Sequence, residues 1–161
     1  MNTKLLKILA EDARLTNAQI GIMLNMGEAD VKEAIADYEK SGVIGGYKAL
    51  VNWEKVDPHH VTALIELKVE PKQDSGFDEI AKRVMAFDQV ESVYLMSGGY
   101  DLAVMIGGSS IQEIAMFVAK RLSPLPSVIS TATHFVLSKY KESGVVMAED
   151  GEQDERGNNV L

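Results

Sequence analysis

Apolar residues in the first part of the chain recur every three or four positions, which is the spacing of one helix face. Three helices are predicted, with apolar faces made by Leu5, Leu6, Ile8 and Leu9, then by Ile20, Met23 and Leu24, and then by Val31, Ile35 and Tyr38. Thr16 and Gln19 form a capping box at the start of the second helix, and Gly42 ends the third. With a strand pair turning on Gly45-Gly46, this order predicts a winged helix-turn-helix. A three-helix bundle without a ligand is the alternative.

From Val51 onward the pattern changes to alternating strands and helices. The predicted order is a strand at Val61–Val69, a helix at Phe77–Ala86, strands at Val90–Ser97 and Asp101–Ile106, a helix at Ile111–Leu122 and a strand at Val128–Leu137. This βαββαβ order is that of a ferredoxin-like domain with both helices on one face of an antiparallel sheet, so the fold class is α+β. Ile65, Leu67, Tyr94 and Val104 suggest more apolar surface than two helices can cover, which predicts dimerisation through the sheets.

Composition divides the chain into four parts. Residues 1–52 are the predicted winged helix-turn-helix, 53–60 a linker, 61–141 the ferredoxin-like domain, and 142–161 an acidic disordered tail. The net charge is −8, and residues 149–161 contribute half of it, because they hold five acidic residues and one basic residue. The folded part is therefore only slightly acidic, which argues against a broad basic surface for nucleic acid but not against a local one.

Targeting and redox signals are absent from the sequence. No run approaches the roughly 20 apolar residues of a membrane span, and the start of the chain lacks the apolar core of a signal peptide. We therefore expect a cytoplasmic protein with no membrane partner. The absence of cysteine excludes disulfides and thiolate chemistry.

Three segments of the sequence carry a family resemblance. They are KILAEDARLTNAQIGIMLNM, YEKSGVIGGYKALVNWEKV and VYLMSGGYDLAVMI. In this order they resemble the opening helices, the end of the DNA-reading helix with wing and linker, and the effector-domain hairpin of the Lrp/AsnC (leucine-responsive and asparagine-related) transcription regulators. The resemblance covers residues 1–141. It implies a homodimer built on the βαββαβ domains that assembles further to a tetramer or octamer, with small effectors, commonly amino acids, bound between dimers.

The resemblance also implies an effector site. The family's effector loop matches Ser97, Gly98, Gly99, Tyr100 and Asp101, and its polar last strand matches Ser130, Thr131 and Thr133. Two glycines allow a ligand to approach the backbone, whose N–H groups can hold a carboxylate, while Asp101 can accept from an ammonium group. In the alternative interpretation, Gly98-Gly99 only forms a hairpin turn that Asp101 caps.

The third predicted helix departs from the family pattern at the positions that face DNA. Where the family places Ser, Arg, Thr and Lys, this chain has five acidic residues and two lysines between Gly27 and Lys40. Carboxylates repel phosphates and cannot make the bidentate arginine contacts that read guanine. Lys32, Lys40 and Lys48 are the candidates for phosphate contact, and Asp30 can accept from cytosine. We predict DNA binding that is weak or depends on avidity in a large oligomer, and a merely solvated helix face is the alternative.

Other chemistry has little support in the sequence. His59-His60 lacks the partners of a metal site, so neither a metal nor a cofactor is predicted, and His134 is expected to be a packed or interface residue. The sirohaem decarboxylases share this two-domain architecture, but their substrate calls for clustered arginine, and the four arginines here are widely spaced. We therefore predict no enzyme. The remaining alternative is an effector-sensing or hetero-oligomerising modulator whose helix-turn-helix does not bind DNA.

Overall fold

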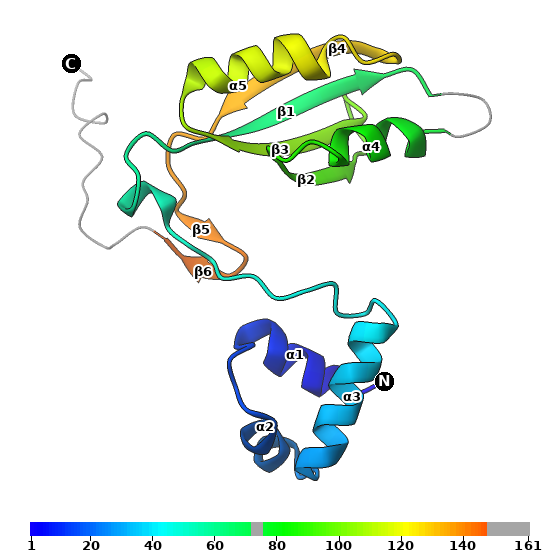
Figure 1. Cartoon of the computed structure of the whole chain (residues 1–161), viewed down its shortest axis with the longest axis vertical. Coiled ribbons are helices and arrows are strands. Elements are labelled where there is room, and N and C mark those ends of the chain that lie inside the picture. The colour runs from blue at the N-terminus through cyan, green and yellow to red at the C-terminus, as the bar shows by residue number, and fades with distance from the viewer. Residues whose placement is uncertain (72–75, 148–161) are drawn as a thin grey trace. The chain divides into compact units, whose positions relative to one another are not determined.

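The computed structural model describes residues 1–71 and 76–147, and the chain folds as two compact units, Met1–Ala49 and Leu50–Leu161 (Figure 1). The first unit consists of α1 (Thr3–Glu11), α2 (Asn17–Leu24) and α3 (Glu28–Lys40). Each helix contributes one fully buried side chain to a common core, namely Leu5, Ile20 and Val31. The predicted capping box is present, because the Thr16 hydroxyl accepts from the Gln19 N–H and the Gln19 side chain accepts from the Thr16 N–H.

The turn between α2 and α3 holds these two helices close together. Asn25 adopts a left-handed conformation with a φ of 53°, which asparagine tolerates better than most residues. The Met26 N–H donates to the Gly21 carbonyl at 2.9 Å. A Cβ atom at Gly21 would lie 2.8 Å from the Met26 carbonyl oxygen, so no larger residue fits there without moving the backbone. The two helices thus form the predicted helix-turn-helix.

Two details predicted for the first unit are wrong. Met23 is exposed, because the buried face of α2 is centred on Ile20, Gly21 and Leu24, roughly 100° around the helix from Met23. The strand pair around Gly45-Gly46 is not formed, and the described residues of this unit include no strand. An isolated two-stranded hairpin is at best marginally stable, and nothing within this unit adds a third strand.

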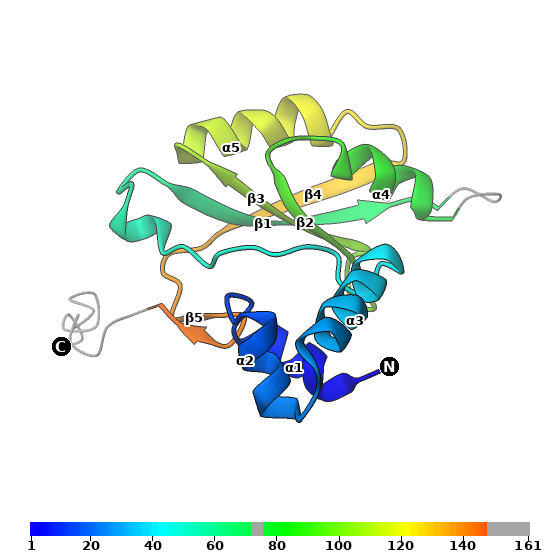
Figure 2. The ribbon, with the colours of Figure 1, turned by 60° about the horizontal axis from the view of Figure 1, so that its bottom comes forward.

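The second unit is an antiparallel sheet with both long helices on one face (Figure 2). Its main elements are β1 (Val61–Val69), α4 (Asp78–Met85), β2 (Val90–Leu95), β3 (Leu102–Gly108), α5 (Ile111–Phe117) with its π-type continuation η2 (Val118–Leu122), and β4 (Val128–Phe135). The strand order is β2-β3-β1-β4, which confirms the predicted ferredoxin-like βαββαβ arrangement. None of the helices in the described residues is long and apolar enough to cross a membrane.

The core of the second unit lies between the sheet and its helices. Ile65 on β1 faces Val104 on β3 and Thr133 on β4, and it is fully buried together with Leu67. Alternation along β1 places these side chains on one face, as the sequence predicts. However, Ile65, Leu67 and Val104 all lie under the helices, so the prediction that they form part of a second apolar face is wrong.

The face of the sheet that the helices leave open has a mixed character. Leu64 and its partner Met105 are half-buried near its middle, and Tyr94 on β2 is exposed. A cross-strand pair joins the His134 Nε2 atom to the Glu66 Oε1 atom at 3.2 Å. The open face is therefore partly apolar and partly charged.

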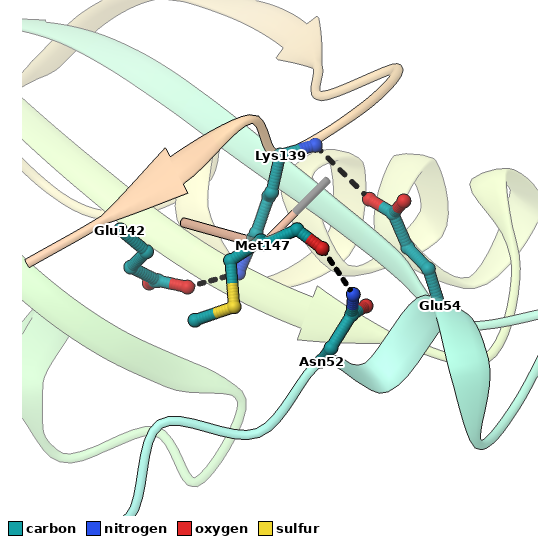
Figure 3. A network of polar contacts seen from close by, with 5 residues as sticks. All are labelled: Asn52, Glu54, Lys139, Glu142 and Met147. Carbon is teal, nitrogen blue, oxygen red and sulfur yellow. Dashed lines mark hydrogen bonds and ion pairs between the residues drawn. The ribbon is translucent and has the colours of Figure 1, made fainter. Parts of the chain in front are cut away.

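A C-terminal hairpin packs on the segment that opens the second unit, which includes the 3-10 turn η1 (Trp53–Lys55). The hairpin consists of β5 (Lys141–Glu142) and β6 (Val145–Val146). The Asn52 Nδ2 donates to the Met147 carbonyl at 2.9 Å, and the Lys139 N–H donates to the Glu54 carboxylate at 3.2 Å (Figure 3). The Lys139 ammonium also pairs with Glu142 at 3.1 Å, and Met147 is buried.

This hairpin corrects the predicted start of the acidic tail. Residues 142–147 belong to the folded unit. Among them, Ser143 and Gly144 have φ values of 47° and 90° and form the tight two-residue turn of the hairpin. The remainder of the predicted tail, residues 148–161, lies outside the described residues.

Candidate functional site

The turn between β2 and β3 contains the five residues of the predicted effector loop, and Asp101 fixes it to the sheet. The Asp101 Oδ2 atom accepts from the Val69 N–H at 2.8 Å, at the end of β1. The Asp101 N–H donates to the Leu67 carbonyl at 3.0 Å, and the Met96 N–H donates to the Asp101 carbonyl at 2.8 Å. Asp101 therefore has the capping role of the alternative interpretation, with one carboxylate oxygen engaged by the backbone.

Unlike Asp101, Gly98 and Gly99 make no contact with the described residues that requires glycine. Neither adopts the left-handed backbone region that favours glycine. Among residues 1–71 and 76–147, a Cβ atom at either position would meet no atom within 4 Å beyond the adjacent residues in sequence. Ser97 beside them is exposed and Tyr100 is half-buried. The fold of this chain therefore does not require glycine at either position, and both backbones are open to approach from outside.

The three hydroxyl residues of β4 do not form one group. Thr131 faces Leu67 and Thr133 faces Ile65, so both lie on the helix-covered face, whereas Ser130 faces Lys68 on the open face. The Thr131 hydroxyl lies 3.4 Å from the hydroxyl of Ser123, which follows η2.

Within one chain, the effector loop and the β4 hydroxyls are also separated. Strand β1 lies between β3 and β4, and two strand spacings amount to roughly 10 Å. The structure thus brings Ser97, Gly98, Gly99, Tyr100 and Asp101 together in one turn but keeps Ser130, Thr131 and Thr133 apart from them.

Sequence reasoning missed Ser127, which lies at the same end of the sheet. Its carbonyl accepts from the Glu70 N–H at 2.8 Å, and its φ of 82° is unusual for a residue other than glycine. The cavity beside it, lined partly by Glu70 and Arg83, measures about 10 Å³ and has room for one water molecule. The only signal in the sequence was the preceding proline, Pro126, which does not predict a left-handed residue.

The candidate DNA-contacting residues are all exposed. Lys32 and Lys40 lie on α3, eight residues apart and therefore about 12 Å apart along the helix axis, and Lys48 follows in the segment after it. Glu28 and Asp30 lie in the first turn of α3, where a negative charge stabilises the helix dipole. These two acidic residues therefore have a structural role that needs no ligand.

Tyr47 connects the segment after α3 to this helix. Its hydroxyl donates to the Glu39 carboxylate at 3.0 Å. Partial burial raises the pKa of Tyr47, and the hydrogen bond and negative charge of Glu39 raise it further.

The histidines do not form a metal site in the part of the chain that the structure describes. The His59 N–H donates to Asp57, and the side chain of His59 is exposed. His60 packs near Trp53, with 5.8 Å between the ring centroids, and its buried Nε2 atom has no hydrogen-bond partner among the residues that the structure describes. His134, expected to be packed or at an interface, lies exposed on the open sheet face beside Glu66.

Comparisons with known proteins agree on one family. Residues 62–146 match the family model of the Lrp/AsnC ligand binding domain. The chain is 49% identical over 155 residues to the uncharacterized HTH-type transcriptional regulator YugG of Bacillus subtilis, covering 96% of this chain and 93% of that protein. It is 23% identical over 147 residues to the leucine-responsive regulatory protein of Haemophilus influenzae, covering 91% and 88% of the two chains.

Solved structures share the same fold. The transcriptional regulator NMB0573 from Neisseria meningitidis, crystallised as a complex with L-Met, superposes with a TM-score of 0.70 at 23% identity. The match covers 86% of this chain and 89% of that chain. It extends over most of the helix-turn-helix and sheet units taken together.

Proposed function

The chain belongs to the Lrp/AsnC family of transcriptional regulators, and we propose that its second unit binds a small effector, an amino acid, at the β2–β3 loop. In this proposal the first unit binds DNA in the cytoplasm, weakly or only through avidity in an oligomer. The observation that carries the proposal is the pair Gly98-Gly99, which the chain's own fold does not require.

The chemistry of the loop suits a zwitterion. Successive backbone N–H groups beside two glycines can hold a carboxylate. Asp101 uses Oδ2 to bind the Val69 N–H, which leaves its other oxygen to accept from an ammonium group. The complex of the related Neisseria meningitidis protein with L-Met supports an amino acid as the class of effector.

The effector site is incomplete in a single chain. Ser130, Thr131 and Thr133 are separated from the loop by β1, so they can contribute only if a second copy brings its β4 to this loop. This arrangement fits a site between subunits, and it links effector binding to assembly.

A titration of the full chain with a panel of amino acids tests this site. We expect one member to bind, and Gly99→Ala to weaken it at least about tenfold, close to 1.4 kcal/mol, because the added methyl group occupies the ligand's approach. Gly45→Ala is the matched control, since Gly45 also has open space and no left-handed φ. Equal affinity in the wild type and Gly99→Ala would contradict the proposal, as would the absence of any binding.

We propose that the open face of the sheet forms a homodimer, which assembles further to a tetramer or octamer. Met105→Lys should then lower the molar mass measured by light scattering, because it buries a charge next to Leu64 in the interface. Met85→Lys makes the same change at an exposed position on α4 and should leave the mass unchanged. The same mass for both variants would exclude this face.

DNA binding is proposed to be weak because α3 presents carboxylates around Lys32. In an anisotropy titration at low salt, Glu33→Lys should tighten binding and steepen the salt dependence by about one unit of log-log slope. Glu11→Lys on α1 is the control with the same net charge. Nanomolar, steeply salt-dependent binding by the wild-type dimer would overturn the proposal, whereas no binding by any variant would favour the alternative of a modulator that does not bind DNA.

The decarboxylase alternative loses support from the arginines of the second unit. Arg83 pairs with Glu79 at 2.7 Å, and the Arg121 guanidinium lies 5.1 Å from the centre of the Phe87 ring. Both cations are engaged by their own unit rather than grouped for a substrate with many carboxylates. Incubation with sirohaem followed by mass analysis should therefore return the substrate unchanged.

A further inference from the structure

The last described residue of the second unit lies beside the segment that leads back to the first unit. The Met147 carbonyl accepts from the Asn52 Nδ2 at 2.9 Å, and the Met147 N–H donates to the Tyr140 carbonyl at 2.9 Å (Figure 3). The side chain of Met147 is also buried. The residues that follow Met147 therefore start from a fixed point next to Asn52.

Residues 148–161 start at this point and carry a concentrated negative charge. They hold five acidic residues and one basic residue, Arg156, and all five acidic residues fall within positions 149–155. Because this acidic segment is covalently attached, it meets nearby cations at an effective concentration on the order of millimolar. Its most important neighbours are therefore the cations within reach of Met147.

Lys48 is the cation of the first unit that is nearest to this point along the chain. It lies four residues before Asn52, so the two Cα atoms are at most about 14 Å apart. Glu152 and Asp154 follow Met147 by five and seven residues, which allows them a reach of roughly 17 and 24 Å. The covalent chain thus permits a contact between these carboxylates and the Lys48 ammonium.

Charge favours Lys48 over the lysines of α3. Lys48 is exposed, is the only charged residue in positions 43–51, and has no ion pair within residues 1–71 and 76–147. Lys32 and Lys40 lie among the five acidic residues of α3. Those carboxylates repel a second set of carboxylates, so the acidic segment meets less repulsion at Lys48.

We propose that the acidic residues of positions 149–155 bind Lys48 of the same chain and take the place of a DNA phosphate there. A single exposed ion pair contributes little, so the contact depends on the covalent attachment and on several carboxylates that share one lysine. It weakens as salt screens the charges. This inference rests on the proposed DNA binding of the first unit and adds a competitor that the chain itself carries.

Carbodiimide cross-linking of the full chain without DNA tests the contact. The reagent joins a carboxylate directly to an amine, and the monomer band of a denaturing gel contains only links within one chain. Lys141 is the reference, because it pairs with Val146 in the hairpin and lies close to the start of the acidic segment in any case. The exposed Lys120 on η2 is the control.

Peptides from positions 149–155 should be linked to Lys48 with at least about half the yield found at Lys141, and to Lys120 with less than about a tenth of it. The yield at Lys48 should fall at least about fivefold in roughly 0.5 M salt. Equal yields at Lys48 and Lys120, no link to Lys48, or a yield that salt does not change would overturn the proposal.

A DNA titration of the full chain tests the competition. The variant that replaces the five carboxylates by amides should bind DNA about fivefold more tightly than the wild type at low salt, because Lys48 becomes available to a phosphate. Its substitutions are Glu149→Gln, Asp150→Asn, Glu152→Gln, Asp154→Asn and Glu155→Gln. In a Lys48→Gln background, the same five substitutions should change the affinity less than about twofold. An equal gain in both backgrounds would overturn the competition, since general repulsion between the acidic segment and DNA does not need Lys48.

The two experiments separate this inference from the proposed function. If no variant binds DNA, the proposed DNA binding is wrong, and the cross-link alone decides whether the acidic segment binds Lys48. If DNA binds but Lys48 is not linked, the inference is wrong and the proposed DNA binding stands.

Discussion

The α2–α3 turn and the β2–β3 turn both contain glycine, but for opposite reasons. At Gly21 the Met26 carbonyl approaches so closely that a side chain would collide with it. At Gly98 and Gly99, apart from the adjacent residues in sequence, no atom of the described residues lies within 4 Å of where a side chain would begin. The first glycine is explained by the fold of its own unit, and the other two are not.

This difference separates residues that maintain the fold from residues that face outward. When contacts within the chain fix the conformation of a turn, a substitution in that turn changes the stability of the fold. A turn whose glycines have open space should change binding instead, because only a ligand or a second copy would meet the added atoms. Asp101 combines the two roles. Its Oδ2 atom accepts a hydrogen bond from the Val69 N–H of the sheet, and its other carboxylate oxygen can accept from a ligand.

The largest effect is expected at Gly21. Gly21→Val should destabilise the first unit by about 3 kcal/mol, because the added atoms force apart two backbones in a tight crossing. Gly21→Ala should cost about 1–2 kcal/mol, since the higher helix propensity of alanine offsets part of the clash. Circular dichroism in urea measures both values, and a stable Gly21→Val variant would show that the α2–α3 crossing is looser than the 2.8 Å approach of the Met26 carbonyl indicates.

Asp101 should show the next largest effect. Asp101→Ala leaves the Val69 N–H without its charged acceptor and should destabilise the second unit by about 1.5–3 kcal/mol. Asp101→Asn keeps an oxygen acceptor, so its loss of stability should be about half that of Asp101→Ala. The same substitution removes the negative charge that is proposed to bind an ammonium group. Denaturant midpoints together with effector titration separate these roles, and equal stability of all three proteins would show that the bond is unimportant.

Gly98→Ala should have almost no effect on stability. A Cβ atom at Gly98 would meet no described residue within 4 Å other than its neighbours in sequence, and Gly98 has no left-handed φ, so the free energy of unfolding should stay within about 0.5 kcal/mol of the wild type. A loss comparable to that of Gly21→Ala would mean that the β2–β3 turn is constrained by its own chain, and the contrast between the two turns would disappear.

The smallest effect concerns the turn between β3 and α5. The Ser109 hydroxyl and N–H donate to the Glu113 carboxylate at 2.6 and 2.7 Å and hold the pKa of that carboxyl below its ordinary value. Because the folded pKa is the lower one, this contribution to stability is present above the unfolded pKa and is lost as the pH falls through the folded pKa. Ser109→Ala should raise the pKa of Glu113 in an NMR titration, and an unchanged value would exclude the contact.

Periodicity in the sequence was sufficient for the main elements because they bury one face each. The alternation along β1 correctly placed Ile65 and Leu67 on one face, and the spacing of Val31 and Ile35 correctly predicted α3. The β5–β6 hairpin was not predicted, because strands of two residues are too short to show an alternating pattern. Its only signal was the Ser143-Gly144 pair, a typical hairpin turn.

The candidate site was predictable only where it is local in sequence. Ser97 to Asp101 form one turn, and the sequence placed them together. Alternation already puts Ser130 and Thr131 on opposite faces of β4, but which face the helices cover depends on tertiary packing. The bond from Asp101 to Val69 joins positions 32 residues apart, and no local pattern encodes such a contact.

The hydrogen bond between Asn52 and Met147 joins the two ends of the described part of the second unit. A domain whose entry and exit lie together can be moved as one module. It can be inserted into a surface loop of a host protein without stretching either partner. Such a fusion would test whether the second unit, with its loop and its sheet, carries the proposed effector binding to an unrelated output.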